Sequence, residues 1–118
     1  MTRLPDLDSL RGAWWALRAL RTTRRALSRG EIRRIAVPNP PPTPAGTIGA
    51  VDAVLQRMQS TCLERALVRQ RWLAAHGEPR AVAIGVTPPS QGFLAHAWLV
   101  GEDDPLADRF HEFTRLDP

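Results

Sequence analysis

The residues best suited to chemistry in this sequence are its single cysteine, Cys62, and a histidine 34 positions further on, His96. A cysteine thiolate is a nucleophile, and a neighbouring imidazole can take its proton. A carboxylate that orients the imidazole would complete a triad able to attack a carbonyl carbon. Because the chain has one cysteine, an intrachain disulfide and a multi-thiolate metal site are both excluded. We therefore expect a site that uses neither a metal nor a cofactor.

Two residues beside Cys62 predict that it begins a helix. Thr61 and Glu64 have the spacing of a capping box, which puts Cys62 at the first helical position. The helix should run to His76, with Gly77 just beyond its end. Free backbone N–H groups and the positive end of the helix dipole favour a thiolate there. The alternative is a small buried apolar cysteine, since capping boxes occur at many helices.

His96 lies in an apolar segment, FLAHAWLV (residues 93–100), that is typical of a β-strand. Alternation along the strand predicts four side chains on the histidine's face: Leu94, His96, Trp98 and Val100. A single histidine in such a strand is often a core residue bonded to a backbone carbonyl. Its pairing with a cysteine at a helix start favours the catalytic interpretation. The other histidines, His76 and His111, are expected to be exposed.

Four aspartates after His96 are candidates for the orienting carboxylate. Asp103 and Asp104 fall in a predicted turn, where aspartate commonly forms the turn itself. Asp117 is one residue from the end of the chain. Asp108 follows a stretch that could return beside the strand of His96, and strand pairing would then bring the two together. Asp108 is therefore our choice, with the other three kept as alternatives.

The first 46 residues form a basic segment that differs from the remainder. Residues 1–35 predict a helix capped by Asp8 and ended near Gly30. Its apolar side chains recur three and four positions apart: Leu7, Leu10, Trp14, Leu17 and Leu20. Arginines follow the opposite face. Residues 36–47 contain five prolines, which exclude a helix and favour an extended connector.

Residues 47–118 are expected to form the catalytic core, within one compact domain overall. The elements expected after the connector are helices at 48–59 and 62–76, strands at 81–86 and 93–100, a turn at 101–104 and a third strand at 105–110. Helices followed by strands indicate an α+β fold. We expect N-terminal helices packed on a small antiparallel β-sheet.

The charge of the chain is uneven. Its 118 residues carry a net charge of +4, every basic residue is arginine, and nine of the sixteen lie in the first 34 positions. This arginine-rich start makes a nucleic-acid-binding module a rival interpretation. The chain lacks a recognition motif and interleaved exposed aromatics, so no nucleic-acid partner is expected.

The sequence also lacks a signal-peptide pattern and any run of about 18 apolar residues. We therefore expect no transmembrane segment and a cytoplasmic location.

Three motifs occur in a specific order: Cys-Leu-x-Arg-Ala-Leu at Cys62, Ile-Gly-Val at 84–86 and Ala-His-Ala-Trp around His96. Together they resemble the leader peptidases of lasso-peptide biosynthesis, in the transglutaminase-like superfamily, over residues 50–116. The resemblance implies a papain/transglutaminase-like fold with the cysteine and histidine as catalytic residues. The family's acid usually follows the histidine by twelve positions, which implies Asp108.

The resemblance also implies a function and partners. The activity would be a cysteine peptidase that removes the leader from a ribosomally made lasso-peptide precursor. The chain shows no leader-recognition domain, so a separate leader-binding protein is implied, together with an ATP-dependent lasso cyclase. A transglutaminase-like acyltransferase using the same triad is the alternative.

The basic N-terminal helix has two interpretations. It could dock an acidic leader, a partner protein or a membrane. It could equally be a solvated face that covers the core, with Trp14 and Leu17 packed inward.

Overall fold

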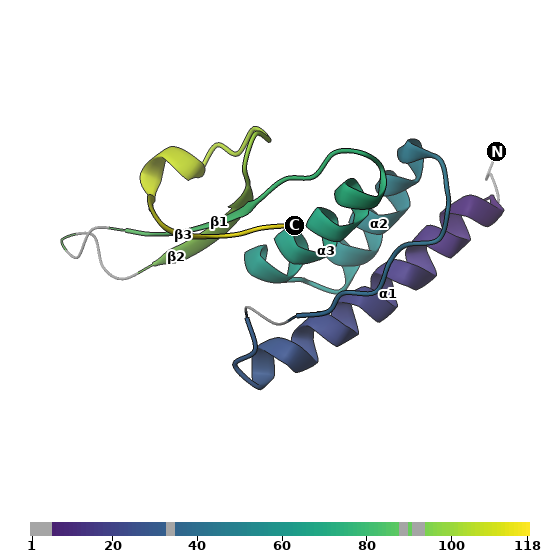
Figure 1. Ribbon diagram of the computed structural model, residues 1–118, viewed down its shortest axis with the longest axis horizontal. Coiled ribbons are helices and arrows are strands. Elements are labelled where there is room, and N and C mark those ends of the chain that lie inside the picture. The colour runs from purple at the N-terminus through teal and green to yellow at the C-terminus, as the bar shows by residue number, and fades with distance from the viewer. Residues whose placement is uncertain (1–5, 33–34, 88–89, 91–93) are drawn as a thin grey trace.

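The computed structural model describes residues 6–32, 35–87, 90 and 94–118 (Figure 1). Its three α-helices are α1 (Leu7–Ser28), α2 (Ile48–Arg57) and α3 (Cys62–Ala75), and its strands are β1 (Val82–Val86), β2 (Ala95–Leu99) and β3 (His111–Leu116). Short 3-10 helices among the described residues include η1 (Ala45–Thr47) and η3 (Ala107–Arg109). The helices pack on one small antiparallel sheet, which confirms the predicted α+β architecture.

The strands lie in the order β2-β1-β3, and both outer strands pair antiparallel with β1. The prediction of a third strand at 105–110 is wrong, because the strand starts at His111. Asp104 Oδ1 accepts a hydrogen bond from the backbone N–H of Leu106 at 2.8 Å, which forms a turn. Pro105 also lacks the N–H that a paired strand would use. The segment therefore turns before β3 begins.

Helix α1 is capped by Asp6, whose side chain accepts from the backbone N–H of Ser9 at 2.7 Å. Asp8, the predicted cap, lies in the first turn. The buried face is also rotated from the predicted one and is made mostly of small residues: Gly12, Trp15, Ala16, Ala19, Leu20, Thr23 and Ala26. Small side chains allow the backbones of α1 and α2 to approach closely, whereas Trp14 is left 63% exposed. Trp14 is thus not packed inward.

One hydrophobic core joins all three helices to the sheet. Trp72 of α3 is 1% exposed and lies 5.6 Å, centroid to centroid, from Trp15 of α1. Gln70 donates to the carbonyls of Arg80 (2.9 Å) and Leu116 (2.8 Å), which ties α3 to β3 and to the approach to β1. The N-terminal segment and the residues after the connector therefore share a single core.

The proline-rich connector is extended from residue 35 to η1, and two side chains hold it. Trp15 Nε1 donates to the carbonyl of Pro38 at 2.9 Å. His76, expected to be exposed, is half-buried: its Nε2 lies 2.9 Å from the carbonyl oxygen of Thr43, and its ring stacks on Trp72 at 4.2 Å. No helix in the described part of the chain has the length and apolar character needed to cross a bilayer.

Candidate active site

Cys62 is the first residue of α3 and is exposed, as the capping box predicts. Thr61 Oγ1 accepts from the backbone N–H of Glu64 at 3.1 Å, and Glu64 Oε1 accepts from the N–H of Thr61 at 2.9 Å. These bonds leave the N–H groups of Cys62 and Leu63 without a helical acceptor. The thiol therefore sits beside two backbone donors and the positive end of a helix dipole.

The start of α3 is fixed by an arginine from α1. Arg24 Nε lies 3.2 Å from Glu64 Oε1, and its Nη2 donates to the carbonyl of Met58 at 2.8 Å. One guanidinium thus joins α1 to the end of α2 and to the capping carboxylate of α3. Since Glu64 is 9% exposed, this contact helps to hold Cys62 in a single place.

His96 lies on β2 with the alternation that the sequence predicts. Ala97 and Leu99 enter the core, whereas His96 and Trp98 lie on the other face. The imidazole stacks against Trp98 at 5.8 Å and contacts Phe110 at 5.2 Å, centroid to centroid. Its side chain is 14% exposed. Aromatic rings therefore limit the positions that the imidazole can adopt.

Gly85 explains how two aromatic rings fit beside the histidine. It is the partner of His96 in the β1–β2 register. A Cβ at this position would lie 2.8 Å from Phe110 Cβ and 2.9 Å from two ring atoms of Trp98. The glycine of the Ile-Gly-Val motif thus leaves room for the rings that cover His96.

The carboxylate that meets His96 is Asp104. Its Oδ2 lies 2.8 Å from His96 Nε2. Burial raises the pKa of Asp104, but the hydrogen bond from His96, the bond from the Leu106 N–H and the charge of His96 outweigh it, so the pKa is lowered overall. The carboxylate is therefore ionised near neutral pH and can orient the imidazole.

The strand pairing that was expected to bring Asp108 to His96 is not present in the described part of the chain. Asp108 is exposed on η3, and β3 pairs with β1 rather than with β2, so strand pairing does not bring it beside the histidine. Asp103 lines the same cavity as His96. Asp117 is exposed at the end of the chain and lines other hollows.

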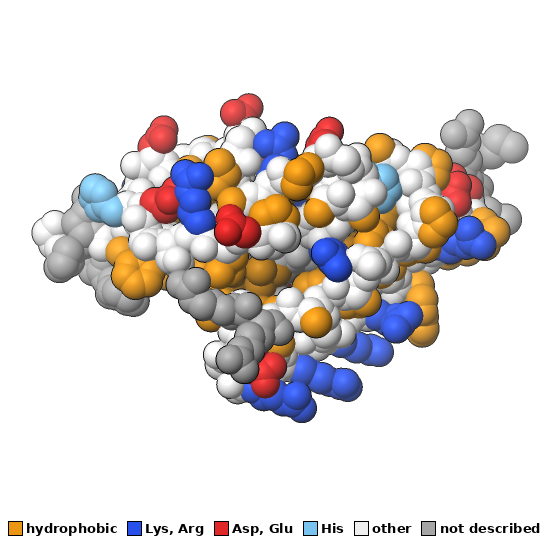
Figure 2. Space-filling model, in the orientation of Figure 1, with side chains coloured by type: hydrophobic (Ala, Val, Ile, Leu, Met, Phe, Trp, Pro, Cys, Tyr) orange, Lys and Arg blue, Asp and Glu red, His pale blue; other side chains and the backbone are white. Residues whose placement is uncertain are grey.

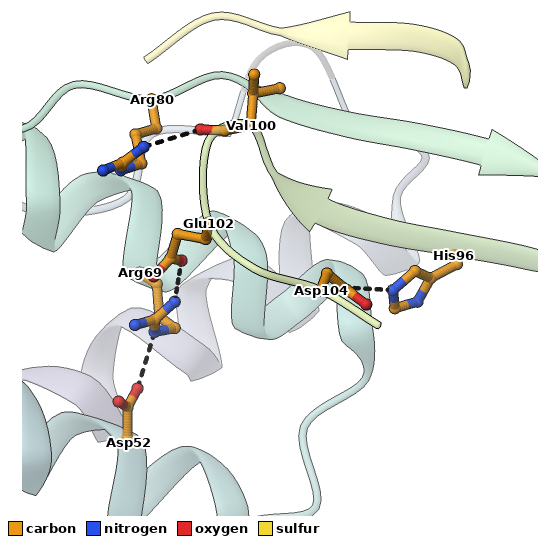
Figure 3. A network of polar contacts seen from close by, with 7 residues as sticks. All are labelled: Asp52, Arg69, Arg80, His96, Val100, Glu102 and Asp104. Atoms are coloured by element: carbon orange, nitrogen blue, oxygen red, sulfur yellow. Dashed lines mark hydrogen bonds and ion pairs between the residues drawn. The ribbon is translucent and has the colours of Figure 1, made fainter. Parts of the chain in front are cut away.

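Two arginines hold the loop that carries Asp104 (Figure 3). Arg69 of α3 forms ion pairs with Asp52 of α2, at 2.9 Å, and with Glu102 of the loop. Arg80 donates to the carbonyl of Val100 at 3.1 Å. Burial lowers the pKa of Arg69, but Glu102 and Asp52 more than offset this and raise it. The loop is thus joined to two helices.

A cavity of about 340 Å³ brings the candidate residues together. Its lining comes from α3 (Cys62, Arg65, Ala66 and Arg69), from β2 (His96 to Leu99) and from the loop (Glu102 to Asp104). Among the described residues, no hydrogen bond joins the Cys62 thiol to His96. The two share a cavity open to solvent, with arginine on one wall and carboxylates on the other.

Sequence reasoning missed Arg69 and Glu102. One signal for Arg69 was available: it lies seven positions after Cys62, and Arg65 lies three after it, so all three share one helix face. Glu102 had no such signal, because its position depends on the path of a loop.

The comparison with known families agrees with this geometry. A family model described as the transglutaminase-like superfamily matches residues 9–117, and the chain belongs to this superfamily. The superfamily includes cysteine peptidases and acyltransferases, and its enzymes generally use cysteine, histidine and aspartate. No curated protein and no solved structure matches the chain significantly.

Proposed function

We propose that the chain is a cysteine peptidase with Cys62 as nucleophile, His96 as base and Asp104 as the orienting carboxylate. The observation that carries the proposal is the cavity shared by these three side chains, with the thiol at a helix start. The superfamily supports the same three residue types. Asp104 takes the role that the sequence assigned to Asp108.

The contacts of His96 suggest how protons would move. Asp104 engages Nε2 at 2.8 Å, which favours the tautomer with its proton on that nitrogen. Nδ1 is then free to accept the thiol proton. The thiolate attacks the scissile carbonyl, and the oxyanion is bound by backbone N–H groups at the start of α3. His96 returns the proton to the leaving amine, and water hydrolyses the thioester to a free acid.

We further propose that the substrate is a ribosomally made lasso-peptide precursor, cleaved between leader and core. This rests on the three motifs around Cys62, Gly85 and His96, each of which has a structural role in the site. A separate leader-binding protein would present the precursor in a reducing compartment such as the cytoplasm. A lasso cyclase would then act on the released core.

Incubation of the protein with a precursor and its leader-binding protein, followed by mass spectrometry, tests the proposal. We expect two fragments, each with a new free end, and none with Cys62→Ala. Thr61→Ser is a matched control, because serine keeps the cap and should keep cleavage. Undiminished cleavage by the Cys62→Ala protein would refute the assignment.

The same experiment separates the alternatives. A new amide in place of a free carboxylate would identify an acyltransferase, since that reaction uses an amine instead of water. A salt-sensitive gel shift with unrelated DNA would support nucleic-acid binding instead.

A further inference from the structure

The outward face of α1 leaves large apolar side chains in solvent. Leu7, Leu10 and Trp14 are 65%, 53% and 63% exposed, although the opposite face of the same helix is fully packed. They recur at spacings of three and four, so they follow one line along the helix. These three apolar side chains lie outside the hydrophobic core.

The line continues across a shallow hollow onto α2. The hollow has a volume of about 350 Å³, and its lining is mostly apolar: Leu10, Ala13, Trp14, Leu17, Val54, Arg57 and Met58. Met58 is 37% exposed. A contiguous exposed apolar surface of this kind marks a contact site. Neither the cavity of Cys62 nor the loop of Asp104 takes part in it.

Arginines share this face of α1. Arg11, Arg18, Arg21 and Arg25 are exposed and lie on the same side of the helix as Trp14. The prediction that the arginines follow the face opposite the apolar side chains is therefore wrong. Arg24 turns toward Glu64 instead. Asp8 is the one acidic residue of α1. Figure 2 shows blue arginine side chains projecting from the lower side of the molecule, where α1 lies. The surface is therefore both apolar and positive.

We propose that this face of α1 binds the surface of an anionic lipid bilayer. A basic helix with tryptophan and leucine at its surface lies in the interface plane, with its apolar side chains at the acyl boundary and its arginines at the phosphates. The side chains project from the ridge of a helix rather than from a deep groove, which suits a flat partner. A second copy of the chain would bring arginine against arginine. The proposal is independent of the reaction at Cys62.

Co-sedimentation of the full chain with vesicles tests the proposal. The probes are vesicles of phosphatidylcholine alone and of phosphatidylcholine with about a third phosphatidylglycerol. We expect binding to the anionic vesicles only, weakened by salt. Trp14 is far more exposed than the core residues Trp15 and Trp72, so a blue shift of tryptophan emission should accompany binding and vanish in Trp14→Ser.

Matched variants distinguish binding through this face of α1 from a general effect of removing an exposed arginine or apolar side chain. Trp14→Ser should weaken binding about tenfold or more, and Arg18→Gln and Arg21→Gln about fivefold each. Phe113→Ser removes a 77%-exposed apolar side chain on β3, and Arg109→Gln removes an exposed arginine from η3. Both controls should bind as the parent does.

Absence of binding to the anionic vesicles at low salt would overturn the proposal, as would equal losses in the controls. Binding of a synthetic acidic amphipathic peptide without vesicle binding would assign the face to a protein partner. Dimerisation in light scattering, lost in Trp14→Ser, would assign it to a second copy. Thiol labelling and precursor cleavage, measured on the same variants, keep these outcomes separate from the proposed peptidase.

Discussion

Asp104 contacts His96 from a loop that follows the histidine's strand: its Oδ2 lies 2.8 Å from His96 Nε2, and the two residues are eight positions apart in the chain. The other carboxylate oxygen accepts from the backbone N–H of Leu106 at 2.8 Å. One side chain therefore both forms the turn and contacts the imidazole. The sequence analysis treated forming the turn and orienting the imidazole as alternative roles for an aspartate. Asp104 combines both.

The first prediction separates the two candidate acids. Asp104→Asn should lower the rate of precursor cleavage about a hundredfold or more, because the imidazole loses the carboxylate that favours its tautomer. Asp108→Asn is the matched control and should cleave within about twofold of the parent. Single-turnover rates on one precursor measure both. The opposite ranking would return the role to Asp108.

The second prediction concerns stability and pH. Burial raises the pKa of Asp104, but its hydrogen bonds with His96 and with the Leu106 N–H bring the pKa below its ordinary value of 3.8, so the ionised form is favoured in the folded state. The resulting stabilisation is present above that value and is lost as pH falls through the lower, folded pKa. The stability difference between the parent and Asp104→Asn should thus be level near about pH 5 and shrink below about pH 4. Urea unfolding at several pH values measures it, and a difference that grows on acidification would contradict it.

The third prediction concerns Arg69. Arg69→Gln removes the ion pairs with Asp52 and Glu102, and the arginine side chain is 20% exposed. We expect a loss of about 1–2 kcal/mol in the free energy of unfolding. Cleavage should show a lower kcat with a smaller change in KM, because the loop that carries Asp104 is loosened.

Arg65→Gln is the control for that experiment. Arg65 lines the same cavity but forms no ion pair within the described residues, so its loss should change stability by less than about 0.5 kcal/mol. Equal destabilisation by both variants would mean that the contacts of Arg69 with Asp52 and Glu102 contribute little.

The fourth prediction uses two glycines. Gly85→Ala should destabilise the fold by about 1–3 kcal/mol and slow cleavage, because its Cβ would press on Trp98 and Phe110 beside His96. Gly49→Ala in α2 meets no atom within 4 Å and should stabilise by about 0.5–1 kcal/mol. Thermal unfolding of both proteins measures the contrast. A Gly85→Ala protein as stable and active as its parent would refute this role for the glycine.

The features that were predicted correctly from the sequence depend on residues close together in the chain. The capping box at Thr61 and Glu64 and the alternation around His96 both involve residues close together in the chain. Such patterns depend on backbone geometry alone, so they can be read without tertiary information. The helix start that carries Cys62 was located to the residue for this reason.

The structure differs from the sequence-based expectations where tertiary contacts determine which elements pair and which faces are buried. Asp108 was chosen as the orienting carboxylate on the assumption that residues 105–110 form a strand beside that of His96. In the structure β3 starts later and pairs with the far side of β1. The face of α1 was misjudged because packing on α2 selects small side chains such as Ala16 and Ala19 over the bulky Trp14. The small buried residues of α1 also recur three and four positions apart, but the bulkier line of Leu7, Leu10 and Trp14 gives the stronger apolar pattern.

The support of the loop by Arg69 and Arg80 has a consequence for comparing relatives. Side-chain contacts, rather than ladder register, determine where Asp104 lies, so residues could be inserted or lost between the histidine and the acid while the two remain in contact. An alignment that counts a constant interval from the histidine would then pair unrelated aspartates. A carboxylate preceded by an arginine-bound glutamate two positions earlier, as Glu102 precedes Asp104, is the better marker to search for.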